Sequence, residues 1–140
     1  MNRIHVVAAV IYGDKQGLSL GHASVKANHI LISCRPKHLH QGGLWEFPGG
    51  KLEADEKPYD GLARELKEEL GIEVIKALPL MKINHDYPDK RVSLDVWTVT
   101  EFNGQGKGLE GQRIQWAPLT EINNFPFPEA NQVILQRILR

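Results

Sequence analysis

The amino-acid sequence predicts a single α/β domain with a mixed β-sheet over residues 1–140, and three observations support it. The length of 140 residues fits one compact domain, and the chain contains no repeat, low-complexity tract or linker. Apolar, β-branched runs typical of strands precede and follow one helical segment. A second helical segment closes the chain, and this order of elements is typical of an α/β domain.

The N-terminal half is predicted to hold two strands and a short third one. Residues 4–12 form an apolar, β-branched run, which is typical of a central strand. Residues 13–28 are rich in Gly, Ser and Lys and are expected to form a loop. The second strand is expected at residues 29–35, because the following Pro36 disfavours its continuation. Residues 44–47 form a short strand that the sequence "PGG" stops.

A helix is predicted next, with Pro58 in its first turn and Gly71 just past its end. At about 100° per residue, the carboxylates of Glu65, Glu68 and Glu69 share an arc roughly 100° wide. The adjacent arc is an apolar stripe of three leucines, Leu62, Leu66 and Leu70. The helix therefore has one face to bury and one acidic face beside it.

The C-terminal half is predicted to contain three strands and a closing helix. The strands are expected at residues 77–87, where Pro79 interrupts the run, at 91–102 and at 113–119. A Gly-rich loop is expected between the last two strands. Apolar residues at five of the positions 133 to 139 favour a helix over residues 128–139.

Composition and charge exclude several classes of protein. A formal net charge of zero argues against direct binding to duplex nucleic acid. The apolar run near the N-terminus is too short to span a membrane, so no membrane association is expected. The one cysteine, Cys34, rules out an internal disulfide framework and suits a reducing compartment, so we expect a cytoplasmic location. The sequence does not reveal the oligomeric state, and we take a monomer as the working expectation.

Negative charge is concentrated between residues 53 and 73, where eight residues are acidic and three are basic. Like charges three and four positions apart on a helix repel one another. Partial burial beside the leucines increases this cost. A hard divalent cation such as Mg²⁺ would compensate, because it prefers oxygen ligands. The alternative is a solvated helix surface of mixed charge.

Residues 50–72 resemble the Nudix box, in which a Gly, a Glu, an Arg-Glu pair, a Glu-Glu pair and a Gly recur at fixed spacing. All seven fixed positions match, namely Gly50, Glu56, Arg64, Glu65, Glu68, Glu69 and Gly71, with Leu66 and Ile72 at the aliphatic positions. The segments 34–53, 85–97, 108–116 and 127–134 are also similar to the MutT-type members of this family. The loop of residues 13–28 is longer than the resemblance predicts.

The resemblance implies an α/β/α sandwich and hydrolysis that depends on Mg²⁺ or Mn²⁺. In MutT-type enzymes water attacks the β-phosphorus of 8-oxo-dGTP, which gives a nucleoside monophosphate and pyrophosphate. Glu68 and Glu69 match the main metal ligands, Glu65 matches a further ligand and possible base, and the Gly49 carbonyl matches a backbone ligand.

Three more residues match supporting roles. Arg64 matches the residue that orients Glu65, and Glu56 matches a supporting carboxylate behind it. Glu110 matches an acidic residue that a loop brings to the metal, and its glycine neighbours favour a mobile loop. Either Glu65 or Glu110 is the general base in this interpretation. The alternative for Glu110 is a solvated loop carboxylate.

The small-molecule nucleotide is expected to contact five residues. Asn131 matches the amide that reads the purine edge, and its alternative is a cap at the start of the last helix. The other four expected contacts are Arg35, His40, Glu46 and Phe47. If they do not contact the nucleotide, their roles would be a surface charge, a polar loop residue, a salt-bridge partner and a core residue, respectively.

Two other functions stay open at this level. A pyrimidine nucleotide diphosphatase that acts on CTP shares the sequences "QGGLWEF" and "VVAAVI". A catalytically silent nucleotide-binding module is the second alternative, although it would be expected to carry a damaged box.

Overall fold

The computed structural model describes residues 3–19, 28–39 and 42–139. The strands in these residues are β1 (Arg3–Gly13), β2 (His29–Cys34), β3 (Trp45–Glu46), β4 (Gly49–Lys51), β5 (Glu73–Asp86), β6 (Arg91–Asn103) and β7 (Arg113–Pro118). The helices are α1 (Pro58–Leu70), two 3₁₀ helices η1 (Leu119–Asn124) and η2 (Glu129–Asn131), and α2 (Gln132–Ile138). None of the described helices is long and apolar enough to cross a membrane.

The sheet is mixed, as the sequence predicts. β1 lies at its centre, where it runs parallel to β6 and antiparallel to β4, and β5 continues the sheet antiparallel to β6. At its C-terminal end β1 also pairs with β2, which in turn pairs with β3 and β7. The sheet therefore splays from β1 into two wings.

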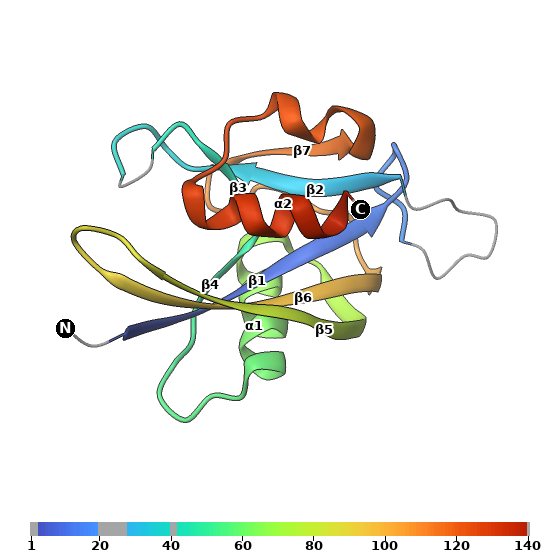
Figure 1. Ribbon diagram of the computed structural model, residues 1–140. Coiled ribbons are helices and arrows are strands. Elements are labelled where there is room, and N and C mark those ends of the chain that lie inside the picture. The colour runs from blue at the N-terminus through green and yellow to red at the C-terminus, as the bar shows by residue number, and fades with distance from the viewer. Residues whose placement is uncertain (1–2, 20–27, 40–41, 140) are drawn as a thin grey trace.

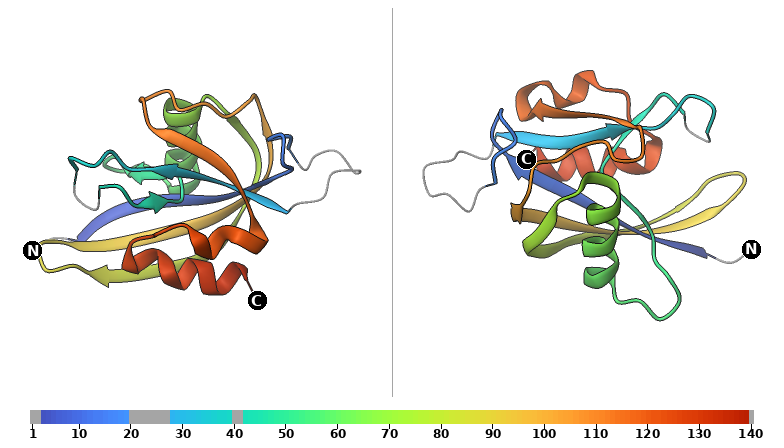
Figure 2. Two further views of the ribbon diagram at one scale, coloured as in Figure 1. Left: turned by 90° about the horizontal axis from the view of Figure 1, so that it is seen from above. Right: turned by 180° about the vertical axis from the view of Figure 1, so that it is seen from behind.

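The two α-helices cover opposite faces of this sheet. α2 lies in front of the strands in Figure 1, and α1 lies in front when the molecule is seen from behind in Figure 2. The alternation of side chains along a strand serves both faces of β1. Val7, Ala9 and Ile11 pack with the α1 leucines, whereas Ala8 and Val10 belong to the core cluster under α2. The α/β/α sandwich is thereby confirmed.

Three details differ from the predicted elements. β5 begins at Glu73 and continues through Pro79, which pairs with Trp97 of β6, and the register shifts between Pro79 and Met81. The segment Gly49–Lys51 forms a strand of its own, β4. The sequence "PGG" predicts only the end of the preceding strand. The closing helix begins at Glu129 as a 3₁₀ turn and becomes α-helical only at Gln132.

Candidate metal and nucleotide site

The ends of α1 are placed by the residues that the sequence singled out. Pro58 occupies the first turn, where its missing N–H would have no helical partner. Gly71 adopts a left-handed conformation with φ of 70°, and its N–H donates to the carbonyl of Lys67 at 3.0 Å. The apolar stripe between these ends is fully buried and consists of Leu62, Leu66 and Leu70. Burial of this stripe fixes the rotation of the helix and turns its acidic face toward β4.

Two glycines of β4 let the helix carboxylates come close to the sheet. The N–H of Gly49 donates to Oε2 of Glu69 at 3.3 Å. The carboxylate of Glu65 lies against the Cα of Gly50, so any side chain at Gly50 would overlap it. Glycine at position 50 is therefore required by the approach of Glu65, whereas a side chain at Gly49 would overlap the backbone carbonyl of Val7 on β1.

Arg64 organises the acidic residues on its side of α1. Its guanidinium makes two hydrogen bonds to Glu56, from Nε at 2.8 Å and from Nη2 at 2.9 Å. Nη1 donates to Glu65 at 3.0 Å and to Glu68 at 3.4 Å, and Nη2 also donates to the Lys51 carbonyl at 3.1 Å. A guanidinium can serve so many acceptors because it carries five N–H donors in a planar fork.

The carboxylates around Arg64 fall into two electrostatic environments, and burial separates them. Hydrogen bonds from Arg64 and from the Glu53 N–H lower the pKa of Glu56 to about 2, so Glu56 is a permanent anion that holds Arg64. Burial raises the pKa of Glu65 in spite of Arg64. Burial, followed by the charges of Glu65 and Glu110, raises the pKa of Glu69 to about 8.

The donor set fits a hard divalent cation, although the ligands are not yet converged. In the part of the chain that the structure describes, no three His, Cys, Asp or Glu side chains already form a metal-binding group. Arg64 holds one oxygen each of Glu65 and Glu68 by hydrogen bonds. A cation beside Glu69 would oppose both the burial and the like charges that raise the pKa of Glu69, and oxygen ligands of this kind suit Mg²⁺ or Mn²⁺.

Exposure separates the predicted ligands. The side chain of Glu65 is 14% exposed, whereas that of Glu68 is 55% exposed. Glu65 and Glu69 thus face the interior of the site, and Glu68 lies at its solvent edge.

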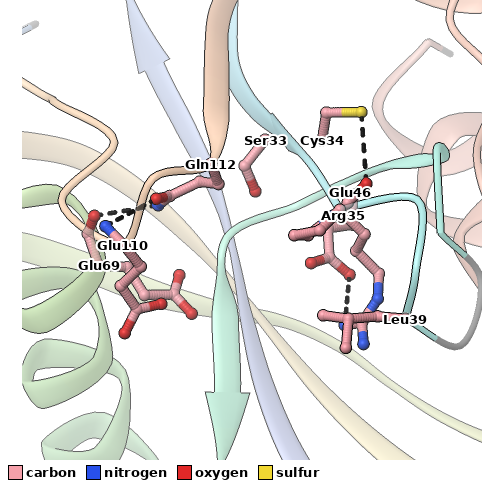
Figure 3. A pocket seen from close by; sticks show the side chains of 9 residues that line it. Ser33, Cys34, Arg35, Leu39, Glu46, Glu69, Glu110 and Gln112 are labelled. Carbon is pink, nitrogen blue, oxygen red and sulfur yellow. Dashed lines mark hydrogen bonds and ion pairs between the residues drawn. The ribbon is translucent and has the colours of Figure 1, made fainter.

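Glu110 lies next to these carboxylates, as the resemblance predicts. It lines a cavity of about 210 Å³ together with Glu69 and Glu46, as Figure 3 shows. Its loop is not free of the helix, however. The N–H groups of Lys107 and Leu109 donate to the last carbonyls of α1, those of Leu70 and Glu69, at 3.0 Å each. The expected mobile loop is therefore anchored on both sides of Gly108.

A cleft leads from the carboxylates to the start of α2. It has a volume of about 380 Å³, and its polar lining residues include Arg35, Glu46, Lys51, Glu69, Lys90 and Asn131. Arg35 and Glu46 form an ion pair at 3.5 Å. Burial nevertheless raises the pKa of Glu46, because it outweighs the charges of Arg35 and Lys90. Both residues line the cleft, so an ion-pair role and a substrate contact are compatible.

The structure places the remaining residues predicted to contact the substrate in different surroundings. Asn131 precedes α2, but its side chain makes no capping hydrogen bond and instead lines the cleft. Phe47 lines the cleft and is also part of the core, since it is 4% exposed and stacks on Phe127 with ring centroids 5.2 Å apart. His40 lies outside the described residues.

The sequence interpretation missed four residues of the site, namely Lys51, Tyr87, Lys90 and Gln112. Lys51 and Lys90 bring positive charge to the cleft, and Tyr87 lines an adjoining pocket that shares Lys90 and Asn131 with the cleft. Lys51 directly follows Gly49 and Gly50, and this position is a signal that could have identified it. Tyr87 and Lys90 lie at the turn between β5 and β6, which only the fold brings to the site.

Known proteins resemble this chain over most of its length. A family model described as NUDIX domain matches residues 22–137. The chain is 40% identical to an 8-oxo-dGTP diphosphatase of Proteus vulgaris over 103 residues, which are 74% of this chain and 81% of the relative. It is 33% identical to a CTP pyrophosphohydrolase of Escherichia coli strain K12 over 99% of this chain and 93% of the relative. A solved structure from a study of MutT from Aliivibrio salmonicida and Vibrio cholerae matches with a TM-score of 0.79 and 36% identity, and covers 99% of this chain and 98% of that one.

Proposed function

The chain belongs to the Nudix family, and from this premise we propose that it hydrolyses 8-oxo-dGTP to 8-oxo-dGMP and pyrophosphate. Such an activity would remove an oxidised precursor from the nucleotide pool and so limit mutation. One observation carries the proposal. A continuous cleft joins the carboxylate Glu69 at one end to the amide of Asn131 at the other. A triphosphate and its base could therefore occupy the two ends together.

Divalent metal ions would be held at the carboxylate end. The proposed ligands are Glu65, Glu68, Glu69, Glu110 and the carbonyl of Gly49, with Mg²⁺ as the metal and Mn²⁺ as a substitute. When bound, the metal would neutralise phosphate oxygens and lower the pKa of a bound water molecule. Glu68 would have to release Arg64, which is a small change for an exposed side chain at 3.4 Å.

The protein's own groups would position the substrate and accept the proton of the attacking water. Glu65 and Glu110 are the two candidate bases. Burial raises the pKa of Glu65, which makes its carboxylate a stronger proton acceptor than an ordinary carboxylate. Arg64 would hold Glu65 in place and is itself held by Glu56. Lys51 and Lys90 would offset the charge of the triphosphate along the cleft.

Asn131 supports the choice of an oxidised purine. Its side-chain amide offers both donors and an acceptor, and it has no capping role that would occupy them. 8-Oxoguanine carries an N7–H donor where guanine has an acceptor. Asn131 is half-buried, and bound nucleotide would cover it further. If its amide accepts from this N–H, guanine would leave the pair mismatched, and such mismatches are disfavoured.

CTP is the second candidate substrate. The relative named CTP pyrophosphohydrolase aligns with 99% of this chain, which is a larger share than the 74% covered by the Proteus relative. We favour the purine because of Asn131 and the higher identity of 40% to an 8-oxo-dGTP diphosphatase. We further propose that residues 1–140 act as one monomeric domain on free nucleotides.

Parallel product analysis tests the proposal. 8-Oxo-dGTP, dGTP and CTP would be offered separately at low, equal concentrations with Mg²⁺, and the products separated by ion-exchange chromatography. The expected result is fast formation of 8-oxo-dGMP and pyrophosphate, with slow turnover of dGTP and CTP. Glu69→Gln should be inactive, and Glu73→Gln is the matched control because Glu73 is exposed on β5. A preference for CTP would transfer the function to the second candidate.

A further inference from the structure

Gln112 is a half-buried residue immediately before β7, and both the oxygen and the nitrogen of its side-chain amide form hydrogen bonds. Its Oε1 accepts a hydrogen bond from the Glu110 N–H at 2.9 Å. Its Nε2 donates to the main-chain carbonyl of Glu69 at 3.0 Å. Figure 3 shows the amide between these two partners. One side chain thus connects the backbone of the loop to the backbone of α1.

The Glu69 carbonyl belongs to the last turn of α1, where carbonyls have no helical partner. The same oxygen also accepts from the N–H of Leu109 at 3.0 Å. The Leu109 bond fixes the loop one residue before Glu110. The Gln112 side chain closes the other side and reaches the peptide of Glu110 itself. Glu110 is therefore held between two attachments to one carbonyl.

The arrangement requires an amide. Glutamine supplies an acceptor for Glu110 and a donor for Glu69, whereas an ionised carboxylate of the same length could only accept. An aliphatic residue could do neither. The two bonds keep Glu110 beside Glu69, and both carboxylates line the same cavity.

We infer that Gln112 is a positioning residue, which holds Glu110 beside Glu69 so that both carboxylates can reach one divalent metal site. The inference rests on the proposed function, since it assigns Glu110 to the metal. Gln112 would not touch the metal or the substrate and would act through Glu110. Residues that orient metal ligands in this way typically contribute about 10- to 100-fold in metal affinity or activity.

Two measurements on the full chain test the inference. Mn²⁺ affinity would be measured by electron paramagnetic resonance for wild type, Gln112→Ala, Glu110→Gln and the double variant. Hydrogen exchange would be followed in peptides that cover residues 107–112 without metal. The matched control is Gln105→Ala, because Gln105 lies exposed in the same loop and no described contact involves it.

Gln112→Ala should weaken Mn²⁺ binding about 10-fold and should speed hydrogen exchange at the Glu110 amide. Gln105→Ala should match wild type in both measurements. In the Glu110→Gln background Gln112→Ala should change Mn²⁺ affinity less than 2-fold, because both variants remove one interaction. An equal loss in both backgrounds would show a general structural effect and overturn the inference. Unchanged affinity in Gln112→Ala would overturn it as well.

The proposed function fails in a different way. If the wild-type chain binds no Mn²⁺, or if Glu110→Gln binds it as well as wild type does, the assignment of Glu110 to the metal is wrong and the positioning role is wrong with it. If both of those measurements come out as expected and only Gln112→Ala has no effect, the proposed function stands and the inference alone is refuted.

Discussion

Replacing Glu69 by Gln should remove a pH-dependent loss of stability from the metal-free protein. Burial and the charges of Glu65 and Glu110 raise the pKa of Glu69 from 4.5 to about 8. Below pH 4.5 the folded and unfolded chains both hold this proton. Between pH 4.5 and 8 only the folded chain keeps it, so the free energy of unfolding falls as the pH rises. One pKa unit corresponds to about 1.4 kcal/mol, which sets an upper bound of about 5 kcal/mol on the loss.

Urea unfolding in EDTA at pH 4.5 and pH 8.5 measures this loss. Glu69→Gln, which cannot ionise, should lose several kcal/mol less than wild type between the two pH values, and the exposed Glu73→Gln should follow wild type. Saturating Mg²⁺ at pH 8.5 should restore wild type, because a cation favours the ionised carboxylate, and should restore Glu69→Gln much less. If wild type and Glu69→Gln change in parallel with pH, the raised pKa of Glu69 is wrong and the crowding of carboxylates at this site does not weaken the fold.

Other substitutions separate the parts of the site. Glu69→Gln should lower Mg²⁺-dependent turnover at least 100-fold while its circular dichroism spectrum stays that of wild type, and wild-type turnover would exclude Glu69 as a ligand. Arg64→Lys should lower kcat about 10- to 100-fold, because one ammonium cannot bridge Glu56 and Glu65 as the guanidinium does; an unaffected kcat would show that Glu65 needs no orientation. Asn131→Ala should reduce the ratio of kcat/KM for 8-oxo-dGTP to that for dGTP by roughly 5- to 150-fold, which corresponds to about 1–3 kcal/mol for a lost hydrogen bond to the base. Its metal affinity should stay unchanged. A constant ratio would place base recognition elsewhere. Leu66→Ala should lower the free energy of unfolding by about 2–5 kcal/mol in a urea titration, because the side chain is fully buried, and a loss below 1 kcal/mol would contradict the packing described for α1.

Local features of the sequence were sufficient to predict α1 and the direction of its acidic face. Pro58 and Gly71 mark its ends through backbone preferences that act within a few residues, and the observed helix begins and ends there. The spacing of Leu62, Leu66 and Leu70 on a helix also determines which face is buried. The central strand could also be predicted locally, since a β-branched run that is apolar on both faces is typical of a strand inside a sheet.

Elements with weaker local signals were not predicted correctly. The three residues of β4 contain two glycines and have no strand pattern of their own, and they are a strand only because they pair with Val6–Ala8 of β1. Likewise, Pro79 predicts an interruption of the strand, but β5 pairs with β6 on both sides of Pro79, with a shift in register after it. In both cases partners distant in the sequence override the local preference.

The residues of the candidate site also fall into two groups, those that the local sequence predicts and those that only the fold brings together. The sequence by itself determined the carboxylates of α1, because Glu65, Glu68 and Glu69 share one helix and their relative positions follow from its period. Only the tertiary structure decided that Arg64 binds Glu56 more closely than Glu68, that Gln112 joins Glu110 to Glu69, and that Lys90 and Asn131 line one cleft. The physical reason is distance along the chain. A helix sets the geometry of neighbours three and four residues apart, whereas contacts between loops and strands depend on how the sheet and both helices pack.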